Sequence, residues 1–467
     1  MKRCALLSFA VILLFTACRK IEVDDNGTNN PPPGGSNDNL VLSGKINADR
    51  TLETGKTYKL KGAVYIVDGA KLTIQPGVVI QGEKSSRGTL VVTRGTQIIA
   101  DGTADKPIVF TSDASTPQRG DWGGIVILGR AKTNASFNGV PGVGEIEGGV
   151  NNAEGLGLYG GADDNDNSGV LKYVRIEYAG YAFLPDKELN GLTLGGVGKG
   201  TVVDHVQVSF ANDDSFEWFG GSVDCKYLIS YKGLDDDFDM DNGYSGRIQF
   251  AIAFRDSSIA DVSGSNGFEI DNDAGGSSLA PQTSAVLSNF SVIGPRAALT
   301  NIGNSNFRRG AHTRRNSALS IFNSIIMGWP NGWNLDASTG TPTDPNYTGS
   351  NPKAVVANTI MGGNNTQFTY SASTSAPTGW TTTDLTAYFN RTGSGNTVLA
   401  TTGDVGLLAP FKYDNTVDFN ATTGSPAASG GDFTNNRLQN SFFASTTFRG
   451  AAGVGDTWWK GWTRYGD

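Results

Sequence analysis

The chain has 467 residues, 63 glycines and a formal net charge of −8 at neutral pH. An acidic chain of this kind does not present the basic surface with which proteins bind nucleic acid or anionic headgroups, so we expect neither partner. With three cysteines and two histidines, the sequence also excludes a disulfide framework and offers little support for a histidine-based metal site or a Ser-His-Asp triad.

The first residues have the pattern of an export signal. Lys2 and Arg3 precede an apolar run that ends at Phe15 and is too short to span a bilayer. The run closes on the sequence FTAC, which resembles the lipobox of bacterial lipoproteins, where cleavage before the cysteine leaves that residue to be acylated. We therefore predict a signal peptide over residues 1–17 and lipidation of Cys18, with an ordinary signal peptide as the alternative.

Residues 18–39 are rich in proline, glycine and asparagine, and they cannot bury enough apolar surface to order themselves. We predict a flexible tether behind the lipidated cysteine. The acids Asp24 and Asp25 resemble the short signal that sends some lipoproteins of the Bacteroidota to the cell surface. The expected location is the outer membrane, with the folded body anchored by its lipid and facing the exterior.

Beyond residue 39 the pattern predicts an all-β fold. Short apolar runs end in Gly, Asn or Asp turns, and long amphipathic helical patterns are absent. Ser209, Ser230 and Ala253 hold matching places in three runs and lie 21 and 23 residues apart, which is the length of one coil of a stacked solenoid. We predict a parallel β-helix with long loops over residues 40–450, and an aromatic C-terminal cap over residues 451–467 that seals its open end.

Four segments share one alternation of apolar and acidic residues. They are residues 214–219, 236–241, 266–271 and 331–336. Because side chains of a strand alternate between faces, the aromatic residues Phe216, Phe238, Phe268 and Trp333 are expected to form one internal column. The residues between them then point outward, about 4.8 Å apart from coil to coil. This arrangement predicts an acidic ladder on an exterior face of a parallel β-helix.

A resemblance to a known group follows from five stretches, which read KLTIQPGVVIQG, GDWGGIVILGR, NDDSFEWFGGSVDCKYLISYKGLDDDFDMDNG, FRRGAHTRRNSALSIFNSIIMGWPNG and FRGAAGVGDTWWKGWTRYGD. They look like surface lipoproteins of the Bacteroidota that have a right-handed parallel β-helix similar to pectin lyases. The resemblance covers residues 40–467 and implies the fold. It does not imply one activity, because coils of this type carry lyases, glycoside hydrolases, adhesins and inert stalks.

The predicted ladder needs compensation, because two carboxylates about 5 Å apart repel by about 3 kcal/mol at an effective dielectric near 20. Arginines of the segment 307–316 would supply it if that segment lies on the same face. Bound Ca²⁺ is a second source, raised carboxyl pKa values are a third, and corner acids can instead accept backbone hydrogen bonds. The candidate calcium ligands are Glu217, Asp239, Asp241, Glu269 and Asp271. The acidic loop 160–169 is read as a solvated turn, with a second ion as the alternative.

Binding of an extracellular glycan or an envelope protein is the favoured function. Phe219 and Tyr244 would stack on sugars, and Asp241 and Asp271 would bind hydroxyl groups. The alternatives are an accessory lipoprotein of an outer-membrane nutrient transporter and an enzyme. A calcium-assisted polysaccharide lyase would use Arg247 or Arg255 as its base, and a glycoside hydrolase would use Glu217 with Asp239 as a retaining pair.

Overall fold

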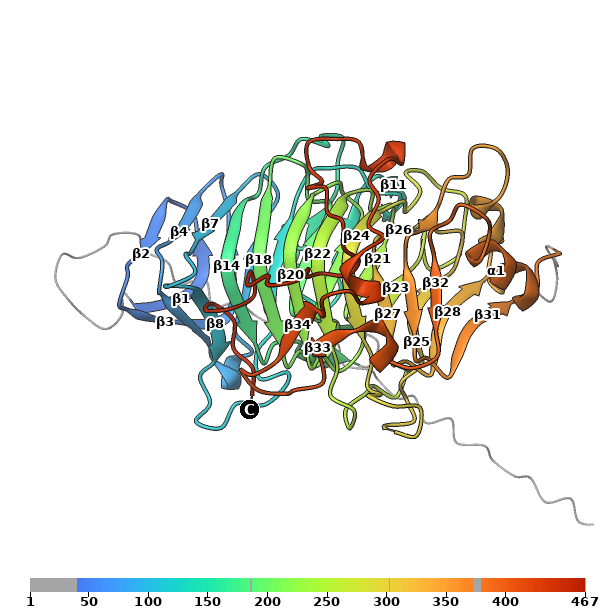
Figure 1. The fold of residues 1–467 in the computed structure, drawn as a ribbon. Coiled ribbons are helices and arrows are strands. Elements are labelled where there is room, and N and C mark those ends of the chain that lie inside the picture. Colours follow the sequence, from blue (N-terminus) through green and yellow to red (C-terminus); the bar gives the residue numbers. More distant parts are fainter. Residues whose placement is uncertain (1–39, 185–186, 302, 373–378, 467) are drawn as a thin grey trace, which may run out of the picture. The chain divides into compact units, whose positions relative to one another are not determined.

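The computed structural model describes residues 40–184, 187–301, 303–372 and 379–466. The predicted signal peptide, the lipidation site Cys18 and the tether lie outside these residues. Leu40–Asp467 is one compact unit, in which 26 strands form a continuous sheet that winds around a common axis (Figure 1). All its strand pairs are parallel, and the prediction of a right-handed parallel β-helix is confirmed.

The wound sheet consists of three ladders, one on each side of the coil. The first ladder contains β2 (Arg50–Leu52), β4 (Lys71–Ile74), β7 (Gln97–Asp101), β14 (Gly169–Glu177), β18 (Val202–Ser209), β20 (Cys225–Tyr231), β22 (Arg247–Phe254), β24 (Val286–Ile293), β26 (Ser320–Phe322) and β29 (Val356–Ala357). The second contains β1 (Val41–Ile46), β3 (Thr57–Ile66), β5 (Val79–Gly82), β8 (Ile108–Ser112), the C-terminal halves of the five strands β14, β18, β20, β22 and β24, and then β27 (Ile325–Met327), β30 (Ile360–Gly362) and β32 (Thr397–Leu399).

The third ladder continues from the C-terminal halves of β1 and β3 and carries the candidate site. Its other strands are β6 (Thr89–Val92), β9 (Gly124–Leu128), β17 (Leu192–Gly195), β19 (Phe216–Phe219), β21 (Phe238–Asp241), β23 (Phe268–Ile270), β25 (Arg309–Thr313), β28 (Asn331–Asp336) and β31 (Thr366–Ser371). Four antiparallel hairpins lie outside the coil: β10 (Ser136–Phe137) with β11 (Val140–Pro141), β12 (Gly144–Glu145) with β13 (Leu158–Tyr159), β15 (Ala182–Leu184) with β16 (Lys187–Glu188), and β33 (Leu407–Ala409) with β34 (Asp418–Ala421).

The first and second ladders share long strands that bend at one residue. Tyr173, His205, Tyr227 and Phe250 have left-handed backbone at this bend, which non-glycine residues seldom adopt. Their rings form an outer stack, with centroids 4.4, 4.3 and 5.0 Å apart from coil to coil. The predicted coil length is close, but Ser230 pairs with Val208 and not with Ser209, so the predicted register is wrong by one residue there.

The C-terminal segment, residues 403–466, lies against the outer face of the second ladder. Trp462 contacts the rings of Tyr173 and His205, and Tyr465 packs edge-on against Tyr231. The predicted end of the β-helix at residue 450 is therefore wrong, because the last strand of the wound sheet is β32. The aromatic residues at the C-terminus cover the side of the β-helix and not its open end. The last coil is covered instead by helix α1 (Thr382–Phe389), whose Phe389 packs on the Phe368 ring of β31 at 4.8 Å.

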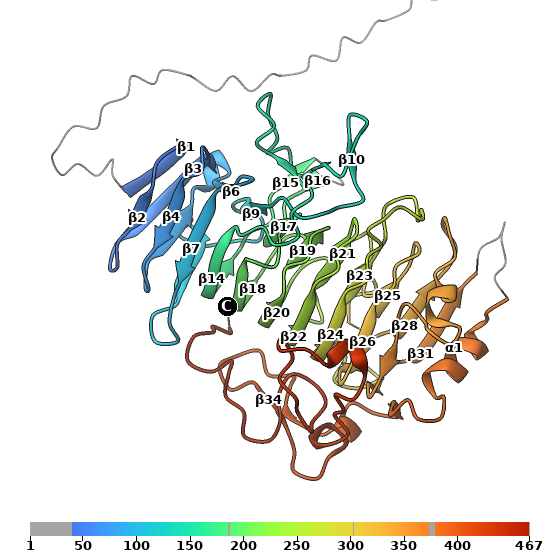
Figure 2. The same ribbon diagram turned by 90° about the horizontal axis from the view of Figure 1, so that it is seen from above.

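A second covering segment lies on the other side of the coil. Residues 129–168, called the insertion below, carry β10 to β13, and Figure 2 shows the hairpins β10 and β15–β16 opposite β34. The insertion packs on the outer face of the third ladder, where Ile146, Val150 and Tyr159 join Leu128 and Phe219 in one apolar cluster. The second ladder is thus covered by a segment that follows the coils, and the third ladder by a segment that interrupts them.

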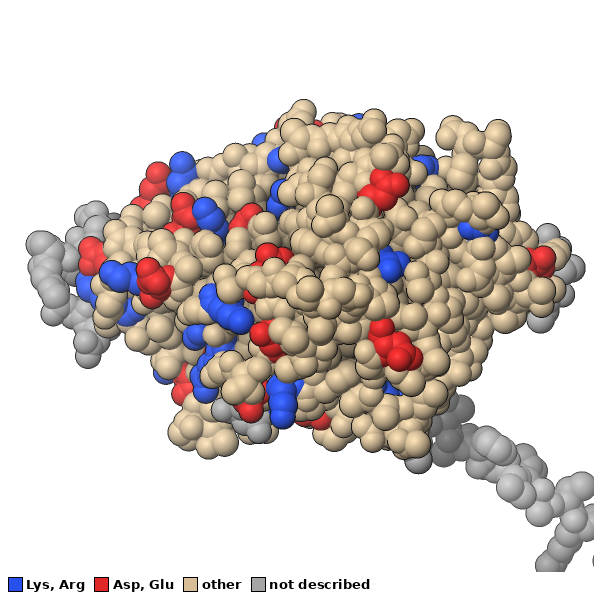
Figure 3. All heavy atoms as spheres, in the orientation of Figure 1, with Lys and Arg blue, Asp and Glu red and all other residues tan. Residues whose placement is uncertain are grey.

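Charged side chains on the visible face of Figure 3 are interspersed, with acidic and basic groups side by side over the first coils and few charges over the last ones. No helix among the described residues is both long and apolar enough to cross a membrane.

Candidate functional site

The third ladder aligns the predicted internal column. Phe216 pairs with Phe238 and Phe238 with Phe268, and their ring centroids lie 5.5 and 5.8 Å apart. Strand β25 then inserts Ala311 before Trp333, so the fourth aromatic lies two coils beyond Phe268. All four aromatic side chains are buried. The column is confirmed, with one additional coil inside it.

The acids point away from this core, as predicted, but they do not form an open exterior face. Glu217 is 8% exposed and Asp271 5% exposed. The insertion approaches this region: the Asn134 side-chain amide donates to the Asn272 carbonyl oxygen at 2.8 Å. The outward side of the ladder is therefore largely covered, with Asp239 and Glu269 still partly exposed, and its carboxylates lose much of the hydration that would stabilise their charge.

The C-terminal half of the ladder is neutralised by cationic side chains. Arg314 pairs with Glu269 and, at 2.7 Å, with Asp271, while Arg315 Nη1 lies 2.6 Å from an Asp271 oxygen. His312 lies between Glu269 and Asp336, at 3.4 and 3.2 Å. Burial raises the pKa of Glu269, but hydrogen bonding to His312 and the charge of Arg314 outweigh burial and hold it below its usual value. The predicted compensation by the segment 307–316 is confirmed here.

The N-terminal half has a different composition. Six carboxylates meet at the corner before the third ladder and on its first acidic coils, and we call them the acidic cluster: Asp213, Asp214, Glu217, Asp235, Asp236 and Asp239. Together with Glu269 they form three overlapping groups, Asp213–Asp214–Asp235, Asp214–Glu217–Asp239 and Asp236–Asp239–Glu269. Within each group one oxygen per residue lies within 4.8 Å of the others.

Two corner acids also accept backbone hydrogen bonds. Asp214 Oδ1 accepts from the Asp236 amide at 2.8 Å, and Asp236 Oδ1 accepts from the Asn266 amide. The predicted turn role is confirmed at Asp236, but neither Asp213 nor Asp235 accepts a backbone hydrogen bond among the described residues. Because a carboxylate has two oxygens, the same residues still contribute to the cluster.

No lysine or arginine among the described residues forms an ion pair with the acidic cluster. Burial, followed by repulsion from neighbouring carboxylates, raises the pKa values of Asp214, Glu217 and Asp239 well above their usual range. Burial and the charge of Asp261 raise the pKa of Asp235 to about 6. Without a counter-ion, part of the cluster is held in the protonated form.

Several oxygen atoms around the cluster have no hydrogen-bond partner among the described residues. Asp239 Oδ1 is one, and the amide oxygens of Asn190 and Asn266 are two more. These asparagines are 4% and 1% exposed, and their amide nitrogens donate to Glu217 and Glu269 respectively. Carboxylate and amide oxygens are the ligands that Ca²⁺ prefers, and two oxygens bound at about 2.4 Å can lie at most about 4.8 Å apart. The donor set fits a hard divalent cation.

The predicted calcium ligands are placed in two environments. Glu217, Asp239 and Glu269 belong to the carboxylate groups, whereas Asp271 is occupied by two arginines. Asp241 accepts from the backbone and side-chain amides of Asn242 at 2.5 and 2.9 Å. The sequence analysis missed four cluster members, Asp213, Asp214, Asp235 and Asp236. The available signal was the Asp-Asp pair that recurs two residues before Phe216 and Phe238.

The predicted bases do not reach the cluster. Arg255 and Asp237 form a fully buried ion pair at 3.0 Å, and the arginine also donates to the Leu234 carbonyl oxygen at 3.1 Å. Arg247 is paired with Asp224 at the start of β22 and lies over the Phe442 ring. Arg255 is therefore too deeply buried to act as a lyase base, and Arg247 is held by Asp224.

The predicted aromatic platforms are buried. Tyr244 has no exposed surface and donates its hydroxyl to the Val223 carbonyl oxygen at 2.8 Å, inside the core. Phe219 packs on Tyr159 of the insertion, with ring centroids 6.0 Å apart. Neither ring can stack on a sugar, because both are buried. The alternation of side chains correctly turned Phe219 outward, but it could not reveal that the insertion covers this ring.

The acidic loop 160–169 has partners of its own. Asp164 pairs with Lys132 at 2.6 Å, and Asp163 accepts from the Asn165 amide at 3.0 Å. A pocket of about 580 Å³ lies next to it, between Arg94 and Arg130. The loop is thus a turn with local partners, as the sequence analysis favoured.

The fold and the site together define a parallel β-helix protein with a covered cluster of carboxylates at one corner of its coils. The chain belongs to the pectate-lyase-like beta helix domain family, whose model matches residues 44–406. Among solved structures, the crystal structure of pectate lyase Pel9A is similar over 89% of this chain and 88% of that chain, with 13% identity and a TM-score of 0.39. No curated protein matches the chain in sequence.

Proposed function

We propose that the acidic cluster binds a divalent cation, with Ca²⁺ as the best fit, and that the bound cation holds an anionic extracellular polysaccharide. The carrying observation is the contrast within one ladder. Glu269 and Asp271 are paired with arginines, whereas no cationic side chain in the described part of the chain is paired with the acidic cluster. Arginines are therefore the counter-charge for one half, and a metal ion is the missing counter-charge for the other.

The magnitude of the repulsion favours a cation over proton uptake alone. Carboxylates on adjacent coils, about 4.8 Å apart, repel by about 3.5 kcal/mol per pair at an effective dielectric near 20. The insertion adds further negative charge, because repulsion from Glu147 contributes, after burial and Asp239, to the raised pKa of Glu217. A site built from so many acids is costly unless a bound ion offsets the repulsion.

The polysaccharide part of the proposal is supported by the membership of a pectate-lyase-like family and by the partial exposure of cluster members. Asp213, Asp235 and Asp239 are each only partly buried, so a cation among them remains reachable from solvent. Ca²⁺ takes six to eight oxygen ligands, and the carboxylate of a sugar acid can supply those that the protein leaves open. We propose binding as the primary role, because both arginines predicted as bases are occupied elsewhere.

The test combines calcium titration with a polysaccharide panel. Isothermal titration should reveal calcium binding, and a chelator at constant ionic strength should lower the melting temperature. Binding of acidic polysaccharides should require calcium, whereas neutral ones should not bind. If calcium neither binds nor stabilises the protein, the proposal is wrong. Unsaturated products or new reducing ends that disappear in Asp239→Asn would instead support the lyase or hydrolase alternative.

We further propose that Cys18 carries the lipid that anchors the protein at the outer membrane, with the β-helix facing the exterior. The lipobox-like sequence FTAC and the acidic residues behind it support this location. Labelling with a radioactive fatty acid should be lost in Cys18→Ala, and external protease should digest the protein on intact cells. Co-purification with an outer-membrane transporter would support the accessory role, and its absence would favour an independent glycan-binding protein.

A further inference from the structure

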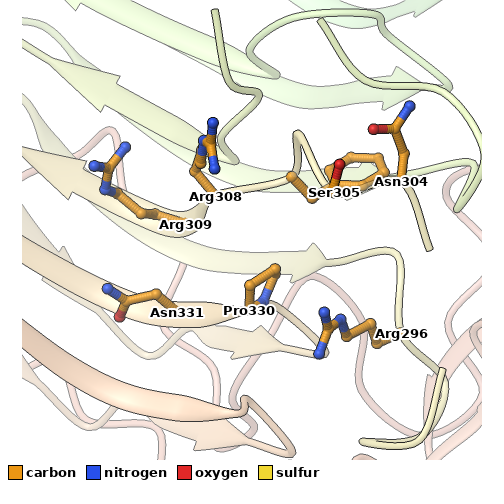
Figure 4. Close-up of a pocket in the computed structure, with 8 residues that line it drawn as sticks. Arg296, Asn304, Ser305, Arg308, Arg309, Pro330 and Asn331 are labelled. Atoms are coloured by element: carbon orange, nitrogen blue, oxygen red, sulfur yellow. The ribbon is translucent and has the colours of Figure 1, made fainter. Parts of the chain in front are cut away.

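A pocket of about 390 Å³ lies beside the neutralised half of the third ladder (Figure 4). Arg308 and Arg309 line one side of it, Pro330 and Asn331 line the other, and Arg296 closes one end. The pocket lies on the same corner of the coil as the acidic cluster, about two coils further along. Three guanidinium groups around one pocket form a distinctly cationic surface in an acidic protein.

The strand register connects the pocket to the cluster. Phe238, Phe268 and Ala311 are paired across β21, β23 and β25, so the residues two positions before them, Asp236, Asn266 and Arg309, are equivalent on successive coils. One corner column thus changes along the helix axis from acid, through amide, to arginine. At about 4.8 Å per coil, the two charged ends lie about 10 Å apart.

Arg308 and Arg309 form no ion pair with the acids of the ladder. Neither the Arg308 nor the Arg309 guanidinium has a hydrogen bond or an ion pair within the described part of the chain. Arg308 is exposed, whereas Arg309 is half-buried, and burial lowers its pKa despite the nearby charges of Glu269 and Asp336. Those two carboxylates already have partners in Arg314 and His312. The pocket therefore keeps uncompensated positive charge.

We propose that this pocket is a second subsite for the same polysaccharide and binds a carboxylate or sulfate group about two coils from the cation. The inference rests on the proposed function. Guanidinium groups bind such oxyanions through paired N–H donors. A separation of about 10 Å is wider than one sugar ring, so the ligand is an oligomer with anionic groups on different residues. The opposite charges at the two ends fix its position along the axis.

The test compares Arg308→Gln with Arg464→Gln, which removes an exposed guanidinium of the C-terminal segment. Arg308→Lys is a second variant that keeps the charge and loses the paired donors. Calcium binding and the binding of hexagalacturonate and of a chondroitin sulfate hexasaccharide in excess calcium are measured for each protein by titration calorimetry. Hexagalacturonate offers carboxylates alone and the chondroitin sulfate hexasaccharide offers carboxylates and sulfates, so binding of the first shows that carboxylate suffices, and binding of the second alone indicates a subsite for sulfate.

Arg308→Gln should keep the calcium affinity of the wild type and lose about tenfold or more in affinity for at least one hexasaccharide. The hexasaccharide affinity of Arg308→Lys should lie between those of the wild type and Arg308→Gln, and Arg464→Gln should match the wild type. Unchanged hexasaccharide affinity in Arg308→Gln would overturn the subsite and leave the proposed function intact. A wild type that binds calcium but neither hexasaccharide would overturn the proposed function, and this inference with it.

Discussion

Substitution of Asp239 by asparagine should raise the stability of the calcium-free protein and reduce the additional stability that calcium provides. Asp239 belongs to two of the three carboxylate groups, and its partners across the ladder are Glu217 and Glu269. Neither of its oxygens has a hydrogen bond among the described residues, so Asp239→Asn breaks none and keeps the shape. The new amide can donate to a neighbouring carboxylate.

The magnitude follows from the spacing of the coils. Removal of one charge relieves repulsions of up to about 3.5 kcal/mol per fully ionised neighbour at an effective dielectric near 20. Because burial and repulsion raise the pKa of Asp239 well above its usual value, only part of this energy is present at neutral pH. In the presence of a chelator, we expect the variant to be more stable than the wild type by about 1–3 kcal/mol. Excess calcium should stabilise the variant by about 1.4–2.7 kcal/mol less than it stabilises the wild type, because the loss of one anionic ligand weakens calcium binding by about tenfold to a hundredfold.

Urea denaturation followed by tryptophan fluorescence measures both values, once with a chelator and once with excess calcium at equal ionic strength. The control is Asp105→Asn, which makes the same change on an exposed turn and should leave both values within about 0.5 kcal/mol of the wild type. If calcium stabilises Asp239→Asn and the wild type by the same amount, the cluster is not a cation site.

Three further perturbations are predicted. Without calcium, the protein should lose stability as pH rises, because burial raises the pKa of Asp235 from 3.8 to about 6. The contribution of the protonated carboxyl to stability is fully present below pH 3.8 and is lost as pH rises to about 6. Calcium should abolish this loss, and identical urea midpoints across that window without calcium would contradict it. Asp237→Asn should cost about 3–5 kcal/mol because it leaves Arg255 buried without its charge partner, and the double variant with Arg255→Met should recover much of this loss in the same assay. Trp462→Ala should cost about 3–5 kcal/mol through loss of ring packing on the second ladder, and a cost below about 1 kcal/mol would mean that the C-terminal segment is only loosely attached.

The alternation of side chains was sufficient to predict the core of the third ladder. Phe216, Phe238 and Phe268 recur at the same offset from their acids, and burial of large rings leaves one arrangement of faces. The register between Ser209 and Ser230 was harder, because both faces of the second ladder are apolar. Where Ile229 and Tyr231 on the outer face are as buried as the inner residues, alternation no longer separates core from surface.

The candidate site was predicted less completely, because its environment depends on segments distant in sequence. No local pattern in Glu217 or Phe219 reveals that the insertion lies over them. Asp236 was interpreted as a turn residue, whereas Asp214 was given no role. Both accept backbone hydrogen bonds, and their role in the cluster appears only when successive coils are superposed. The arginine partners were predictable because their segment is itself one coil of the ladder.

The C-terminal segment changes how the solenoid is expected to unfold. In a simple repeat array each coil contacts only its neighbours, so the ends can fray while the middle persists. Here Trp462 and Tyr465 pack on coils near the middle, while Val405 and Phe419 share one apolar cluster with residues from Ile229 to Ile360. The C-terminal segment contacts several coils at once and should therefore couple their unfolding into one cooperative transition. Hydrogen exchange should show the backbone amides of these coils opening together.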